Sequence, residues 1–208
     1  THSYSSAASD VYKRQCRGCS AKIKTKYFII ELISALSFVL IFHVYGISLT
    51  TLLLFILSIC FIIIFFIDLQ HFIRPNEITY PLMIIGFLKS FDPNLNLHLF
   101  PHFINSLIGG IFGFTIIWLI IFIYKKLRNK DGMGLGDAKL LSAIGFWFGW
   151  VSIPFIIFFS SAIALLSVVP DLIKKKKQLS SQIPFGPYLI IGNLVFLFLI
   201  NPIKIFIN

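Results

Sequence analysis

Residues 47–67, ISLTTLLLFILSICFIIIFFI, carry no charged side chain. A helix needs about 20 apolar residues to cross the hydrocarbon core of a bilayer, and this run is long enough. Other apolar runs lie at 28–45, 78–91, 103–124, 138–172 and 188–206. The run at 138–172 is too long for one span, and Gly149, Trp150 and Pro154 predict a tight turn that divides it. We therefore predict an all-α polytopic membrane helix bundle with about seven transmembrane helices.

The composition excludes an ordinary water-soluble globule. Of the 208 residues, 57% are hydrophobic and only 12% are charged, against about 25% charged residues in a soluble domain. The same hydrophobicity excludes a disordered chain. The net charge of +10 could suit a nucleic-acid partner, but the basic residues form short clusters between apolar runs, as in the cytoplasmic loops of membrane proteins. We expect a lipid bilayer as partner and no nucleic acid.

The positions of the basic residues test this topology. If residues 16–26 are cytoplasmic, alternate loops should be basic. The later basic positions on that side are Arg74, 125–139 and 174–177. Of the 18 lysines and arginines, only Lys89 and Lys204 fall toward the outside. This alternation predicts that the N-terminal segment lies in the cytoplasm.

The first fifteen residues have a different character. Residues 5–15, SSAASDVYKRQ, resemble the in-frame translation of a transposase-type sequencing adapter. Residues 1–15 are therefore expected to be adapter-derived and unrelated to function. We expect the intact gene to continue upstream, with another CxxC pair and at least one further transmembrane helix before Cys16.

Two of the eight acidic residues stand out. Asp68 directly follows the uncharged run, and Asp137 closes GMGLGD and precedes an apolar helix. The predicted topology puts both at cytoplasmic helix ends. A carboxylate at membrane depth costs about 2.5–3.5 kcal/mol, so it usually has a functional or pairing reason. Taken singly, each could instead cap a helix or pair with a lysine, and Asp137 could be the N-cap of the following helix.

Together the two aspartates indicate a chemistry. Two carboxylates brought close share one proton. The ionised one can take a proton from water while the protonated one polarises a scissile carbonyl. Gly132, Gly134 and Gly136 remove side chains just before Asp137, so that an extended peptide could lie there. This is aspartic-protease chemistry, which requires neither a covalent intermediate nor a metal.

Four segments resemble one family. GMGLGDAKLL at 132–141 resembles the GxGD signature of the type IV prepilin leader peptidases, which are membrane-embedded aspartic proteases. The other three resemble the first catalytic segment, the C-terminal segment and the second half of the cytoplasmic cysteine loop: IDLQHFIRPNEITYPL at 67–82, IPFGPYLIIG at 183–192 and CRGCSAKIKTKYFIIEL at 16–32. The resemblance covers essentially all of residues 16–208, in the family's order.

This resemblance implies specific roles. Asp68 and Asp137 would be the catalytic pair. The supporting or substrate-proximal residues would be Gly134, Gly136, Lys139 and Pro75. Residues 16–27 would be the remnant of a cytoplasmic cysteine loop and 28–208 the membrane-embedded peptidase domain. The family acts at the cytoplasmic face of the bacterial inner membrane. It cuts the basic leader from type IV prepilins or pseudopilins, commonly after a glycine.

The cysteine loop bears on cofactors. Many family members methylate the new N-terminus with S-adenosylmethionine, and members with the full loop have two CxxC pairs. Four thiolates would suit structural zinc, but Cys16 and Cys19 supply only half of such a site. We expect no cofactor for the peptidase reaction, and zinc and S-adenosylmethionine only in the full-length protein.

Other interpretations stay open at this point. A transporter or proton-coupled channel would use intramembrane aspartates, although these acids sit at helix ends and no midplane chain of polar groups links the two faces. A non-catalytic membrane scaffold is a third reading. Lys139 could tune the aspartates or snorkel to the interface. His71 and Arg74 could contact substrate or face lipid headgroups.

Overall fold

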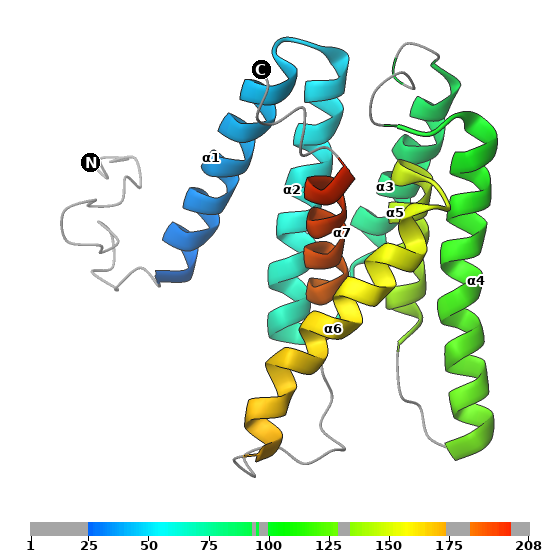
Figure 1. Cartoon of the computed structure of the whole chain (residues 1–208). Helices are drawn as coiled ribbons and strands as arrows, with labels where there is room; N and C mark the ends of the chain where they lie inside the picture. The colour runs from blue at the N-terminus through cyan, green and yellow to red at the C-terminus, as the bar shows by residue number, and fades with distance from the viewer. Residues whose placement is uncertain (1–24, 93–94, 96–99, 129–133, 174–183, 201–208) are drawn as a thin grey trace, which may run out of the picture.

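The computed structural model describes residues 25–92, 95, 100–128, 134–173 and 184–200. These residues form α-helices and one 3-10 turn, and contain no strand. The elements are α1 (Thr25–Tyr45), α2 (Leu49–His71), α3 (Asn76–Leu88), η1 (Lys89–Phe91), α4 (Phe103–Arg128), α5 (Leu135–Phe148), α6 (Ser152–Ile173) and α7 (Gly186–Ile200). The predicted all-α bundle is confirmed, and every predicted apolar run forms at least part of a helix (Figure 1).

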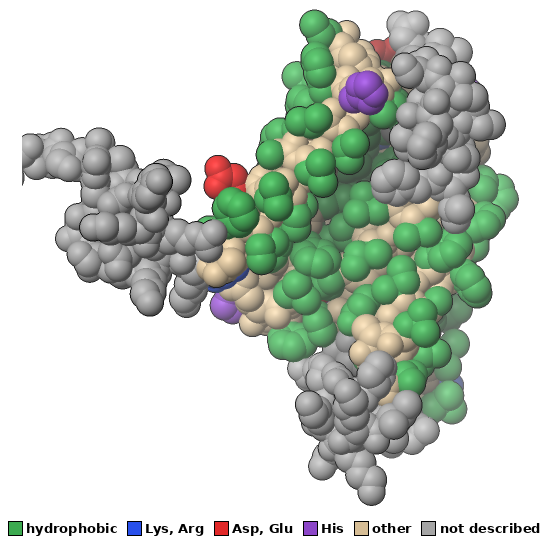
Figure 2. Space-filling model, turned by 60° about the vertical axis from the view of Figure 1, so that its left-hand side comes forward, with side chains coloured by type: hydrophobic (Ala, Val, Ile, Leu, Met, Phe, Trp, Pro, Cys, Tyr) green, Lys and Arg blue, Asp and Glu red, His purple; other side chains and the backbone are tan. Residues whose placement is uncertain are grey.

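The helices differ in length. Four of them, α1, α2, α4 and α6, are long and apolar enough to cross a membrane, while α7 is a shorter apolar helix. Figure 2 shows hydrophobic side chains spread over the face it presents, with few charged ones. Such a surface suits lipid rather than water, so the chain is a multi-pass membrane protein.

The predicted turn between α5 and α6 is confirmed. Gly149 has φ +81°, a conformation that glycine adopts without steric cost, and its N–H donates to the carbonyl of Gly145 at 2.8 Å. The Ser152 hydroxyl donates back to the carbonyl of Gly149 at 2.7 Å. Pro154 falls in the first turn of α6, where its missing N–H breaks no helical hydrogen bond.

Helix α5 is the buried centre of the bundle. Ten of its 14 residues are buried, and it packs chiefly against α4 and α3. Gly109 of α4 and Gly145 of α5 approach so closely that a Cβ on either would overlap the other's backbone. The Ser142 hydroxyl donates to the carbonyl of Gly110 at 2.8 Å. Close packing and this hydrogen bond fix α5 along its length, and with it the residue that begins it.

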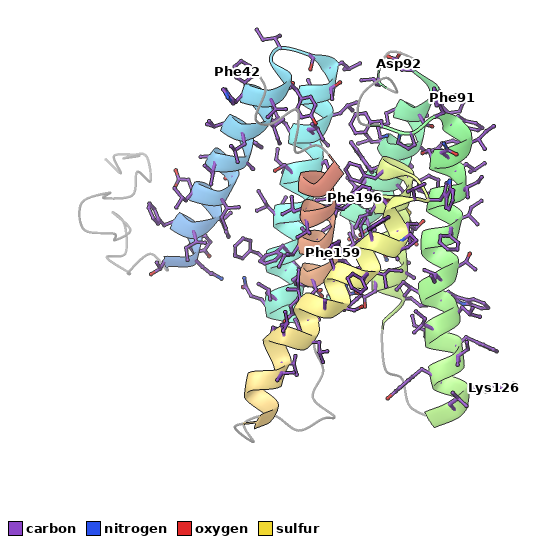
Figure 3. All side chains as sticks on the ribbon, viewed as in Figure 1. Phe42, Phe91, Asp92, Lys126, Phe159 and Phe196 are labelled. Carbon is purple, nitrogen blue, oxygen red and sulfur yellow. The ribbon has the colours of Figure 1, made fainter. Side chains whose placement is uncertain are left out.

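The topology brings three helix termini together. Helix α2 ends where α5 and α7 begin, at the lower end of the bundle in Figure 1. We call this the aspartate end and define it by Asp68, Arg74 and Asp137. The opposite end, defined by Lys89, Phe100 and Trp147, is the lysine end. In Figure 3 the labelled Asp92, which follows η1, lies at the upper end of the bundle, and Lys126 lies near the lower end of α4.

Candidate active site

Asp68 lies in the last turn of α2 and is fully buried. The helix ends at His71 because Phe72 adopts a left-handed conformation, φ 56°, and its N–H donates to the carbonyl of Asp68 at 3.0 Å. This reversal turns the following residues back toward the helix end. Arg74 is thereby brought against the side chain of Asp68.

Asp137 is the third residue of α5 and is only 2% exposed. Gly134 is the N-cap of that helix, and the N–H of Asp137 donates to its carbonyl at 3.2 Å. The alternative that Asp137 is the N-cap is therefore wrong. A carboxylate in the first turn is still stabilised by the positive end of the helix dipole.

One guanidinium joins the two aspartates. The Nε atom of Arg74 lies 3.3 Å from Oδ1 of Asp68, and its Nη1 forms an ion pair with Oδ1 of Asp137. The arginine side chain is 8% exposed. A guanidinium presents its donors in a rigid planar fork, so a single arginine can hold two carboxylates at once. The structure thus brings together two residues that the sequence separates by two intervening helices, α3 and α4.

Two glycines line this cluster. A Cβ on Gly136 would lie 3.3 Å from Nε and 3.4 Å from Cδ of Arg74, and a Cβ on Gly186 would overlap Oδ2 of Asp68. Gly186 is the first residue of α7 and belongs to the segment IPFGPYLIIG at 183–192, which resembles the family's C-terminal segment. The space that Gly136 leaves is filled by Arg74 in this structure, where the sequence predicted room for an extended peptide.

The other predicted site residues lie around the cluster. The ammonium of Lys139 donates to Oδ1 of Asn76 at 2.8 Å and lies 5.0 Å from the centre of the Tyr80 ring; within the described residues it forms no ion pair with either aspartate. Lys139 therefore ties α5 to the start of α3. Pro75 is the N-cap of α3, and its carbonyl accepts from the Thr79 hydroxyl at 2.8 Å.

Some predicted residues are exposed or lie outside the described part of the chain. Gly134 is exposed, and a Cβ on it would lie 3.9 Å from the backbone nitrogen of Gly136, an ordinary contact. Cys16, Cys19 and Gly132 lie outside the described residues. In the segments that the structure describes, no group of three or more His, Cys, Asp or Glu side chains is placed to hold a metal ion.

The contact of Arg74 with the two aspartates is the feature of the site that sequence reasoning missed. The headgroup-facing interpretation of this residue is wrong, because its side chain is buried against two carboxylates. His71, by contrast, is exposed at the end of α2. The available signal was a lone arginine six positions after a membrane-depth aspartate. Ionisable residues there usually pair with one another.

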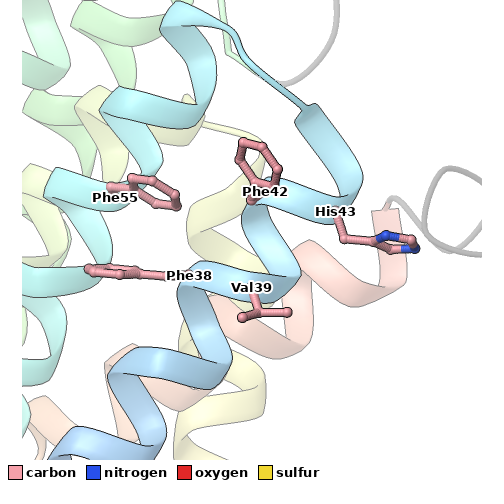
Figure 4. Close-up of a pocket in the computed structure, with 5 residues that line it drawn as sticks. All are labelled: Phe38, Val39, Phe42, His43 and Phe55. Atoms are coloured by element: carbon pink, nitrogen blue, oxygen red, sulfur yellow. The ribbon is translucent and has the colours of Figure 1, made fainter.

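A separate hollow opens between α1 and α2. It is lined by Phe38, Val39, Phe42, His43 and Phe55 (Figure 4). Phe55 lies thirteen positions before Asp68 on α2, or about 20 Å along the helix axis. The hollow is almost wholly apolar and remote from the aspartates, so it does not belong to the candidate active site.

Comparison with known proteins matches the chain to the family that its sequence motifs resemble. The type IV leader peptidase family matches residues 54–169, a range that contains both aspartates, and the bacterial peptidase A24 N-terminal domain matches residues 11–45. The prepilin leader peptidase/N-methyltransferase of Aeromonas hydrophila is 33% identical over 178 residues, covering 86% of this chain and 60% of its own length.

Two further relatives carry the same name. The protein of Neisseria gonorrhoeae is 33% identical over 86% of this chain and 59% of its own length. That of Xanthomonas campestris pv. campestris is 39% identical over 64% of this chain and 44% of its own length. The chain thus spans about 60% of the length of the curated relatives it matches. No solved structure matches it.

Proposed function

Because the chain belongs to the type IV leader peptidase family, we propose that it is a membrane aspartic endopeptidase that removes the leader peptide from type IV prepilins or pseudopilins. One observation carries the proposal: two buried carboxylates, Asp68 and Asp137, contact the same guanidinium at one end of a membrane bundle. The curated relatives are named prepilin leader peptidase/N-methyltransferase. A transporter finds no support among them.

The two carboxylates can divide the work of peptide hydrolysis. The ionised aspartate accepts a proton from a water molecule as the water oxygen attacks the scissile carbonyl carbon. The protonated aspartate donates its proton to the carbonyl oxygen. As the C–N bond of the tetrahedral intermediate breaks, the aspartate that took the water proton passes it to the leaving amine, and a hydroxyl group of the intermediate returns a proton to the other aspartate. The reaction consumes one water and leaves the pair as it began.

We place the aspartate end at the cytoplasmic face of the bacterial inner membrane. Basic residues gather at this end: Lys26 at the start of α1, Arg74 after α2, and Lys125 and Lys126 in the last turn of α4. An excess of lysine and arginine marks cytoplasmic loops. A substrate with a basic leader and an apolar helix would then present its junction beside Asp68 and Asp137.

One further activity and one metal site are proposed for the full-length protein alone. Methylation of the new N-terminus with S-adenosylmethionine and a structural zinc site would both draw on a complete cysteine loop. Cys16 and Cys19 would supply two of the four thiolate ligands in a tetrahedral zinc site. The peptide cleavage proposed above does not depend on either.

The test is cleavage of a prepilin in membranes by the product of the full-length gene. The wild-type protein should release the leader, and Asp137→Asn should not, while its membrane insertion and thermal stability stay largely unchanged. Asp171→Asn, a substitution at the end of α6 on the same side, is the matched control and should stay active. Near-normal turnover by Asp137→Asn would end the aspartic-protease proposal.

A further inference from the structure

The arrangement of the site in this structure differs from the one that hydrolysis needs. Hydrolysis needs one protonated and one ionised carboxyl group. In the structure Arg74 contacts both carboxylates, and a cation this close favours the ionised form of each. The three side chains are also almost completely buried, so neither carboxylate is open to a peptide. In this arrangement the three side chains close the site to a peptide, and the charge on Arg74 opposes the protonation that hydrolysis needs.

We propose that Arg74 is an internal latch: its guanidinium contacts both Asp68 and Asp137, and a bound peptide displaces it from at least one of them. The inference rests on the proposed peptidase function. Displacement does two things at once. It exposes a carboxylate to the peptide, and it removes a positive charge that opposes protonation of either carboxyl group, so that the pair holds its one catalytic proton more readily.

The latch can move while the aspartates stay in place. Asp68 and Asp137 belong to helices α2 and α5, whereas Arg74 lies on the short non-helical link between α2 and α3. Its side chain runs past Gly136 and Gly186, neither of which has a side chain to hold it. A change in the link's backbone would withdraw the guanidinium without shifting either helix.

The surrounding charges leave Arg74 as the cation that controls the pair. His71 on α2 and Glu77 on α3 are exposed. Lys139 on α5 is engaged with Asn76, and α7 approaches the pair with Gly186. Within the described residues, Arg74 is the one cation that forms an ion pair with either aspartate. Removing it should therefore change the protonation of both.

The first measurement needs no substrate. A water-soluble carbodiimide with an amine nucleophile labels protonated, accessible carboxyl groups, and mass spectrometry locates the label. At pH 7 we expect Asp68 and Asp137 to be protected in the full-length wild-type protein and labelled at least about tenfold more in Arg74→Met. Lys26→Met is the matched control. It removes a half-buried lysine near the same end, whose ammonium donates to Gln70, and it should keep the wild-type labelling pattern.

The second measurement is the pH profile of prepilin cleavage. Arg74→Met should still cleave, with the alkaline limb of its profile moved upward by about one to two pH units, because an adjacent cation depresses carboxyl protonation by that order. Arg74→Lys retains the positive charge but lacks the planar fork of donors. Labelling of its aspartates and the shift of its alkaline limb should therefore lie between those of the wild type and Arg74→Met. It also serves if Arg74→Met does not fold. A residue with only a structural role would leave the limb in place.

Three results would overturn the latch. They are unchanged labelling in Arg74→Met, an unchanged alkaline limb, or loss of cleavage by both variants while their thermal stability is native. If the wild-type protein cleaves no prepilin, the peptidase proposal fails, and the labelling experiment still decides whether Arg74 guards the two carboxylates.

Discussion

The two ends of the bundle both bury charge, and they satisfy it in different ways. At the aspartate end, Asp68, Arg74 and Asp137 are compensated by one another. At the lysine end, the ammonium of Lys89 donates to the backbone carbonyl of Trp147 at 2.9 Å and lies 3.9 Å from the centre of the Phe100 ring. Helix α5 carries Asp137 in its first turn and Trp147 near its last, so one helix connects both arrangements.

The two ends differ in whether the partners of the buried ionisable group can themselves change charge. A backbone carbonyl and an aromatic face cannot change their charge, so Lys89 is the one member of this cluster that can, and burial lowers its pKa to about 7. Each group at the aspartate end depends on the charge of another, so one proton or one displaced side chain alters all three. Breaking a buried pair by removing one partner is costly. The protonation of such a site therefore responds to any group that binds or moves there, and aspartic-protease chemistry requires a change of protonation.

The largest expected effect comes from neutralising either aspartate. Asp68→Asn and Asp137→Asn should each lower prepilin cleavage by about 10³-fold or more, because each removes one half of a unit that acts together. The double variant should be little worse than either single one. Steady-state cleavage in membranes measures this. Additive losses in the double variant would show that the two carboxylates act independently.

The next largest effect should come from Gly186→Ala, which alters the shape of the aspartate end and none of its charges. The added Cβ would overlap Oδ2 of Asp68 and push the carboxylate out of place. Small displacements of a catalytic group cost about tenfold to a hundredfold in rate, so cleavage should fall by that factor. Thermal unfolding in detergent should change less than for Gly145→Ala, the matched glycine at the α4–α5 contact, which should destabilise the bundle by about 1–3 kcal/mol.

A substitution at the lysine end should lower the stability of the protein and leave its activity nearly unchanged. Lys89→Met keeps the length of the side chain but leaves the Trp147 carbonyl without its donor, at a cost of about 1–2 kcal/mol. The unfolding temperature should fall, and cleavage below that temperature should persist. Loss of cleavage by a folded Lys89→Met protein would contradict the division between the two ends.

The smallest effect is expected for Lys139→Met. This lysine bonds Asn76 at the surface of the aspartate end, and surface polar contacts are worth about 0–1 kcal/mol. Cleavage should therefore fall by no more than about fivefold, without a shift of the pH profile. A shift comparable to that of Arg74→Met would mean that Lys139 tunes the aspartates directly, as the alternative sequence interpretation held.

Local sequence properties predicted much of this molecule. The length of each apolar run set the helices, and the glycine-containing break at Gly149 divided the longest of them, because both depend on residues adjacent in the chain. The positions of Asp68 and Asp137 beside apolar runs likewise placed both at one side of the bundle, since the intervening runs predict an out-and-back path. The structure confirms these helices and brings the two aspartates together.

What only the tertiary structure decided is which side chains meet at that end. The sequence indicated that the two aspartates were close, yet Arg74 lies between them, because the left-handed turn at Phe72 reverses the chain. Gly186 reaches Asp68 because α7 begins beside the end of α2. Both facts depend on how helices distant in sequence are rotated and stacked. The pattern of apolar residues does not reveal these rotations, because a helix that faces lipid on one side and other helices on the other can be apolar all round.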